Sequence, residues 1–168
     1  AFQNITLNAQ KDSCLFVSPV KHQILSSGSF GEPRSTHFHS GVDIKPYHGS
    51  GKDALVAIGD GYISRIRITP DSYGKAIYLD HPCGYTSVYA HMDSFNSTIE
   101  DYIDKVRIAT KKSEIDQIPP PNALKIKQGD ILGYMGNSGN SFGAHLHFEI
   151  RNTTSEAPIN PVLFGIGP

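Results

Sequence analysis

Short runs of alternating apolar and polar residues, separated by turns rich in glycine and proline, make up most of this 168-residue chain. Alternation with period two is typical of half-buried β-strands, because successive side chains of a strand point to opposite faces of the sheet. Seven segments fit this pattern: residues 42–44, 54–57, 61–69, 75–80, 86–91, 131–134 and 145–151. The pattern predicts a mainly β fold, an antiparallel sheet or sandwich core with largely local connections.

One stretch departs from the strand pattern. Residues 97–117 place their apolar side chains at close to helical spacing, with acidic residues early and lysines late. Ser97 or Thr98 is the expected N-cap, and the proline run 119–121 returns the chain in an extended form. We therefore expect a short helix at about 97–117, within an insertion at 95–124 on the β core.

The strand expected at 145–151 carries chemistry on one face. His145 and His147 share that face, while Leu146 and Phe148 point to the opposite face and into a core. Apolar side chains packed behind two imidazoles make a stiff platform for a divalent metal such as zinc.

Two other segments, residues 39–43 and 89–93, add imidazole and carboxylate groups. His39 and Asp43 are four residues apart, and a bend at Gly41 would bring both side chains to one metal ion. A catalytic zinc ion commonly has three protein ligands from histidine and carboxylate groups and one position for water. These two residues and one histidine of the pair at 145 and 147 would complete such a set.

Each of these residues also has a plainer interpretation. A single histidine on a β surface is more often solvated than a ligand, and Asp43 alone could cap a turn. His37 competes with His39, because residues 37–39 form a second His-x-His pair. The histidines without partner residues in the sequence are expected at the surface: His22, His48 and His81.

Composition narrows the class of protein. Lys and Arg number 15 against 16 Asp and Glu and form no basic block, so the sequence does not indicate a nucleic-acid partner. The longest apolar runs are far shorter than the ~20 residues of a membrane-spanning helix. The length suits one domain, which we expect to be a monomer. The chain begins at Ala1, which either a mature exported protein or a trimmed one would show, and we expect export.

Cys14 and Cys83 are the two cysteines of the chain. A disulfide between them would close a long loop, but a pair of unpaired small residues would fit the sequence equally well, since two cysteines form no framework pattern. Neither has the spacing of a metal-binding cysteine.

Four segments, taken in order, resemble the lysostaphin/LytM-type zinc endopeptidases, which cut peptide crosslinks in bacterial peptidoglycan. They are residues 39–44, 89–92, 133–141 and 145–149. The resemblance spans about residues 18–164 and implies a duplicated hybrid motif β fold with an open, metal-bearing groove. It implies a peptidase domain at 18–168, preceded by an N-terminal extension at 1–17.

Carried over residue by residue, the resemblance implies that His39, Asp43 and His147 bind one zinc ion per chain. It places His91 and His145 beside the metal-bound water and the substrate carbonyl. Zinc can lower the pKa of its water toward ~7 and polarise a carbonyl group. An imidazole, which titrates near ~6.5, suits the proton transfer, and the sequence leaves open which of the two performs it.

The implied function is a zinc-dependent endopeptidase of the cell envelope, periplasmic or extracellular, with a peptidoglycan peptide as substrate. Some members of the family cut glycine bridges and others the D-Ala to diaminopimelate link. We expect the latter, because residues 118–130 look more like those of Gram-negative members. Two alternatives are a non-catalytic LytM-like regulator of another cell-wall hydrolase, which would normally lack metal ligands, and a zinc carboxypeptidase. The insertion at 95–124 could shape the groove or be a surface embellishment.

Overall fold

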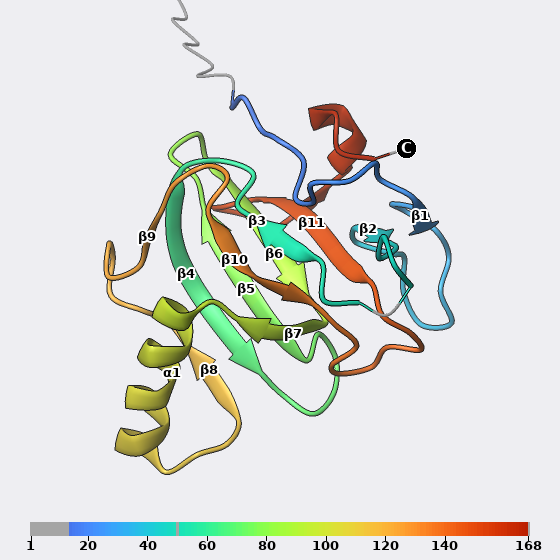
Figure 1. The fold of residues 1–168 in the computed structure, drawn as a ribbon. Coiled ribbons are helices and arrows are strands. Elements are labelled where there is room, and N and C mark those ends of the chain that lie inside the picture. Colours follow the sequence, from blue (N-terminus) through green and yellow to red (C-terminus); the bar gives the residue numbers. More distant parts are fainter. Residues whose placement is uncertain (1–13, 50, 168) are drawn as a thin grey trace, which may run out of the picture.

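The computed structural model describes residues 14–49 and 51–167, which form two β-sheets and one α-helix (Figure 1). This confirms the mainly β class, and all seven expected strands are present to within about a residue at each end. The elements are, in chain order, β1 (Ser26–Gly28), β2 (Val42–Ile44), β3 (Ala54–Val56), β4 (Gly61–Ile68), β5 (Lys75–Asp80), β6 (Tyr85–Ala90), β7 (Met92–Phe95), α1 (Ser97–Thr110), β8 (Ile115–Gln117), β9 (Lys125–Ile126), β10 (Ile131–Met135), β11 (Leu146–Asn152), β12 (Pro158–Ile159) and the 3-10 helix η1 (Pro161–Phe164).

The larger sheet has the order β1-β2-β11-β6-β5-β4-β8, with β12 beside β11 and β9 beside β4. The smaller sheet has the order β3-β10-β7, and the pairs in both sheets are antiparallel. The β4-β5-β6 meander has the local connections expected from the sequence. The neighbours of β11, namely β2 and β6, come instead from far away in the chain, so that three distant segments meet at one place.

The core lies between the two sheets, with the smaller sheet packed over the larger one (Figure 1). On β11 the alternation is clear, because Leu146, Phe148 and Ile150 are fully buried in this core. His147 and Glu149 therefore project from the opposite face of the larger sheet. Burial of the apolar set fixes the register of β11, since a slip of one residue would turn every side chain to the wrong face.

The insertion folds partly as expected. The N-cap of α1 is Asn96, whose side chain accepts a hydrogen bond from the Ile99 amide at 2.9 Å, rather than Ser97 or Thr98. The helix ends at Thr110, because Lys111 adopts a left-handed conformation, so the expected helix at 97–117 is too long. The end of the expected helix, residues 115–117, forms β8 instead, which pairs with the edge of β4.

Cys14 and Cys83 form a disulfide, which settles the choice left open by the sequence. The bond joins the start of the described chain to the turn between β5 and β6. The expected N-terminal extension at 1–17 lies mostly outside the described residues. Within those residues, no helix is long and apolar enough to cross a membrane.

Candidate metal centre

The centre forms where β2, β11 and β6 lie side by side in the larger sheet. Asp43 on β2 is the register partner of His147 on β11, and His147 is also the partner of Ala90, the last residue of β6. His39 reaches the same place from the loop before β2. The chain bends at Gly41, where a side chain would place its Cβ only 2.2 Å from the Phe148 carbonyl oxygen. The expected bend is therefore present, and it requires glycine.

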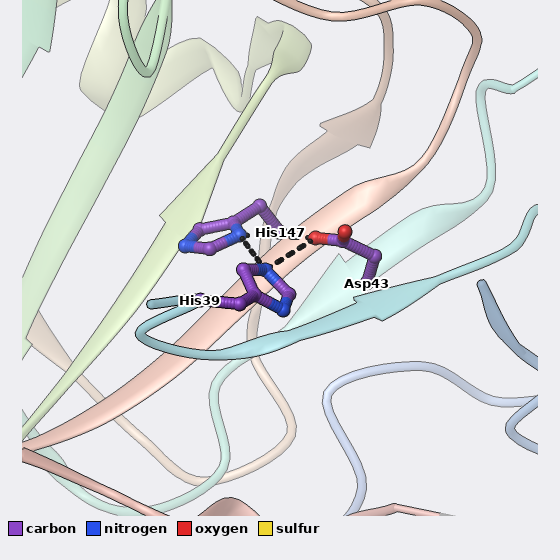
Figure 2. A group of neighbouring side chains, drawn as sticks. All are labelled: His39, Asp43 and His147. Atoms are coloured by element: carbon purple, nitrogen blue, oxygen red, sulfur yellow. Dashed lines mark hydrogen bonds and ion pairs between the residues drawn. The ribbon is translucent and has the colours of Figure 1, made fainter. Parts of the chain in front are cut away.

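Three ligand atoms converge on one point (Figure 2). Asp43 Oδ1 lies 3.0 Å from His39 Nε2 and 3.0 Å from His147 Nδ1, and the two ring nitrogens are 2.9 Å apart. All three residues are buried. The structure thus brings together the residues expected as metal ligands.

The outer ring nitrogens decide which atoms face the centre. His39 Nδ1 lies 2.8 Å from the Ser29 carbonyl oxygen, and His147 Nε2 lies 2.7 Å from Glu149 Oε1. Both of these oxygens can only accept, so the outer nitrogens donate. This leaves His39 Nε2 and His147 Nδ1 as lone-pair donors facing the Asp43 carboxylate. Three acceptors that face one another need a cation between them, and the set of two nitrogens and one oxygen suits zinc.

The pKa values of Asp43 and His147 are consistent with a cation between these side chains. Burial would raise the pKa of Asp43, but its hydrogen bonds with His147 and His39 hold that pKa well below its usual range. Burial would lower the pKa of His147, yet Asp43 and Glu149 raise it to about 9. Without a metal ion, His147 therefore carries a second proton at neutral pH. This proton lies where the metal ion would bind and compensates the negative charge of Asp43 and Glu149.

Arg34 holds the second oxygen of the Asp43 carboxylate. Its Nη2 donates to Asp43 Oδ2 at 2.8 Å, and its Nε lies 3.2 Å from Glu32 Oε1. A side chain at Gly28 would overlap this pair, since its Cβ would lie 2.4 Å from Asp43 Oδ2. The guanidinium fixes the carboxylate so that Oδ1 faces the two imidazoles.

His91 follows the end of β6 and lies next to this ligand set. Its Nδ1 donates to the Ser138 carbonyl oxygen at 2.8 Å, which leaves Nε2 free to accept a proton. Its ring centroid is 5.9 Å from that of His147. Burial lowers the pKa of His91 to about 4, so the imidazole is neutral at neutral pH. Its backbone φ is 60°, a conformation that residues other than glycine rarely adopt.

His145 completes the group from the loop before β11. Its Nδ1 lies 2.8 Å from the Gly143 carbonyl oxygen, and its Nε2 lies 3.6 Å from Asp43 Oδ1. The ring centroids of His145 and His91 are 4.8 Å apart. Two imidazoles outside the ligand set thus stand beside it, each with Nδ1 held by a backbone carbonyl.

The remaining histidines lie elsewhere. His37, the alternative to His39, is exposed and lies 3.0 Å from the Thr36 hydroxyl, outside the ligand group. His81 contradicts the expectation of a surface position. It is buried, with Nδ1 2.9 Å from the Asp60 carbonyl oxygen and Nε2 2.9 Å from the Ser87 hydroxyl. Its partners lie in a turn and on a strand, so sequence spacing did not indicate them.

The model of "Peptidase family M23" matches residues 37–114 and 121–161. The DD-carboxypeptidase/endopeptidase Mpg of Neisseria meningitidis is 26% identical over 124 residues, which cover 74% of this chain and 22% of that protein. The chain thus spans about a fifth of the length of this curated relative.

Solved structures have the same fold. The catalytic domain of lysostaphin from Staphylococcus simulans superposes with a TM-score of 0.62 at 22% identity, covering 84% of this chain and 91% of that domain. Csd3 of Helicobacter pylori gives a TM-score of 0.61 at 25% identity, with 92% of this chain and 34% of Csd3 covered. Since the family model matches well over half of its residues, including all five of the residues described above, the chain belongs to peptidase family M23.

Proposed function

We propose that this chain is a zinc-dependent endopeptidase that hydrolyses peptide crosslinks of bacterial peptidoglycan. The observation that carries the proposal is the convergence of three lone-pair donors, from His39, Asp43 and His147, next to two imidazoles held outside that set. When bound there, zinc would supply a water of lowered pKa and polarise the scissile carbonyl. The complete donor set argues against a purely regulatory domain without a metal.

His91 and His145 are the catalytic residues in this proposal. The backbone carbonyls of Ser138 and Gly143 orient their rings and keep the proton on Nδ1, so that each Nε2 can exchange a proton with water or substrate. The lowered pKa of His91 suits a group that must start neutral and accept a proton. A protonated imidazole at either position would stabilise a developing oxyanion.

The proposed bond is the D-Ala to diaminopimelate crosslink. It joins two D-configured centres, and Mpg is named as a DD-carboxypeptidase/endopeptidase. The disulfide supports an extracytoplasmic location, because such bonds persist in oxidising compartments. We further propose that the domain at 18–168 acts as a monomer with one zinc ion.

Mass spectrometry of muropeptides tests this function. The purified, zinc-loaded chain is incubated with diaminopimelate-crosslinked peptidoglycan and, separately, with glycine-bridged peptidoglycan. We expect crosslinked dimers of the first substrate to become monomers while the second stays intact. Release of single D-Ala residues without loss of crosslinks would identify a carboxypeptidase instead. If the metal-loaded chain cuts neither substrate, the endopeptidase proposal is wrong.

A further inference from the structure

We propose that Glu149 and Tyr73 are positioning residues, which tie the ligand His147 to the backbone of His91. This inference rests on the proposed function, because it concerns how the same centre is held in shape. Neither side chain belongs to the ligand set. Both would act through the imidazoles that they touch.

Glu149 is a fully buried carboxylate, and both of its oxygens accept hydrogen bonds. A buried carboxylate is costly unless it is completely hydrogen-bonded, so its surroundings indicate a defined role. Its Oε1 accepts from His147 Nε2 at 2.7 Å, from the Ser40 hydroxyl at 2.6 Å and from the Tyr73 hydroxyl, and its Oε2 accepts from Arg151 Nε at 2.6 Å.

The consequence for His147 is a fixed tautomer. An imidazole with its proton on Nε2 has its lone pair on Nδ1, and Nδ1 is the atom that faces Asp43. Without the carboxylate, the neutral ring could carry its proton on either nitrogen, and the tautomer protonated on Nδ1 would be unable to bind a metal through that atom. Glu149 therefore keeps one ring proton on Nε2, so that Nδ1 is the nitrogen that gives up its proton to a metal ion.

Tyr73 links this carboxylate to the other side of the centre. It lies in the turn between β4 and β5, and its hydroxyl donates to Glu149 while its backbone carbonyl accepts from the His91 amide at 2.9 Å. Its ring centroid is 5.2 Å from that of His147 and 6.5 Å from that of His91. A left-handed backbone such as that of His91 persists only where its surroundings hold it, and this carbonyl is one of those contacts.

Arg151 fixes the direction of the tyrosine hydrogen bond. Its Nη2 donates to the Tyr73 hydroxyl at 3.2 Å, and a guanidinium has no acceptor. The hydroxyl proton of Tyr73 must therefore point to Glu149. Together with Ser40, these hydrogen bonds link the orientation of His147 to the position of the turn that holds His91.

Two conservative substitutions test the proposal, Glu149→Gln and Tyr73→Phe. Tyr62→Phe is the matched control, since the Tyr62 hydroxyl also donates to a carboxylate, Asp80 at 3.3 Å, but outside the centre. Zinc affinity is measured by competition with a chromophoric chelator, and the geometry of the site by the visible absorption of the cobalt-loaded chain. We expect Glu149→Gln to lower zinc affinity ~10- to 100-fold and Tyr73→Phe to lower it less, up to ~10-fold.

Activity is measured at saturating zinc, so that a lower kcat reports a change in the position of the side chains and not the loss of metal from the variant. Tyr73→Phe should lower kcat with little change in KM and alter the cobalt spectrum, while Tyr62→Phe leaves both unchanged. Thermal unfolding of the metal-free variants shows whether each one folds. If both folded variants bind zinc and absorb like the control, the proposal is overturned. A parent chain that binds zinc but cuts no peptidoglycan would remove the proposed function alone, since the affinities and spectra would still decide the positioning roles. A parent chain that binds no zinc would overturn both.

Discussion

Each imidazole of the centre has one ring nitrogen committed to an acceptor of the protein. Backbone carbonyls hold His39, His91 and His145, and a carboxylate holds His147. Because these partners each hold one ring nitrogen, they define which nitrogen of each ring faces the centre. We propose that the side chains of the centre divide into a ligand group and a proton-transfer group, and substitutions should separate the two.

Asp43→Ala should remove both metal and activity. The substitution deletes the only carboxylate of the ligand group and leaves Arg34 without its partner at Oδ2. We expect zinc affinity to fall by more than the ~100-fold that marks the loss of an outer residue. Metal analysis and muropeptide digestion measure the two effects, and Asp93→Ala, at an exposed carboxylate, is the control. An Asp43→Ala chain that keeps its zinc would show that the ligand assignment is wrong.

His91→Ala should keep the metal while hydrolysis collapses. His91 lies outside the group of three ligand residues, and a general acid or base contributes ~10²- to 10⁴-fold to the rate. We therefore expect kcat to fall by about that factor at unchanged zinc content. His37→Ala, at an exposed ring, is the matched control. Turnover equal to that of the parent would exclude His91 from the mechanism.

His81 should make the metal-free fold less stable in weak acid. Burial lowers its folded-state pKa below the ordinary value near ~6.5, so the unfolded chain binds the proton first. The stability that comes from a neutral His81 is complete above that ordinary value and is lost as the pH falls below it. Urea unfolding at pH 8 and pH 5.5 should show a larger loss of free energy of unfolding for the parent than for His81→Gln. Equal losses in both chains would contradict this account.

Sequence spacing predicted part of the centre. The period-two pattern and the bend at Gly41 indicated His39, Asp43 and one histidine of the pair at 145 and 147, and the family resemblance singled out His147. The same pattern places Glu149 on the face of His147. Ser29 and Tyr73 could not be predicted, because they contribute through a backbone carbonyl and through a turn that only the folded sheet brings near.

At the scale of elements, the break between β6 and β7 positions a catalytic candidate. The sequence predicted one strand at 86–91, but β6 ends at Ala90 in the larger sheet and β7 begins at Met92 in the smaller one. His91 lies at the crossing, with φ at 60°. The alternation of apolar and polar residues cannot reveal this change of sheet. The change accompanies the positive φ of His91, which side-chain polarity does not encode.

The insertion at 95–124 contributes to the core as well as to the surface. Ile99 and Ile103 are buried on α1, and Ile115 is buried on β8, within the range where a helix was expected. Asp116 of β8 pairs with Arg65 of β4 through two hydrogen bonds of 2.7 Å. The insertion thus lengthens the larger sheet by one strand, on the side away from the metal centre.

Asn96→Ala tests how much the start of α1 contributes to stability. Loss of the side-chain cap on the Ile99 amide should cost about 1 kcal/mol of free energy of unfolding. Thr98→Ala, at an exposed residue that the sequence alone offered as the cap, should cost much less. Denaturant titrations of the two variants measure the difference. A larger cost for Thr98→Ala would contradict the cap seen in the structure.

At the scale of the whole molecule, the metal centre and the disulfide lie at opposite ends of strand β6. The larger sheet gathers β2, β11 and β6 at the metal centre, whereas the turn between β5 and β6 carries the disulfide. β6 connects the two places, with the turn before Tyr85 and His91 directly after Ala90. Six extended residues span about 20 Å, so the bond and the centre lie well apart.

The disulfide should therefore stabilise the fold without tuning the metal centre. It closes a loop across a sequence separation of 69 residues, for which chain entropy predicts a contribution of up to ~4 kcal/mol. The double variant Cys14→Ser and Cys83→Ser should unfold at a lower denaturant concentration, yet bind zinc within about twofold of the parent, because no ligand contact depends on the bond. Denaturant titration and chelator competition on one preparation measure both. Weakened zinc binding in a chain that is still folded would show that β6 transmits strain from the disulfide to His147, the register partner of Ala90, and would contradict this independence of the disulfide and the centre.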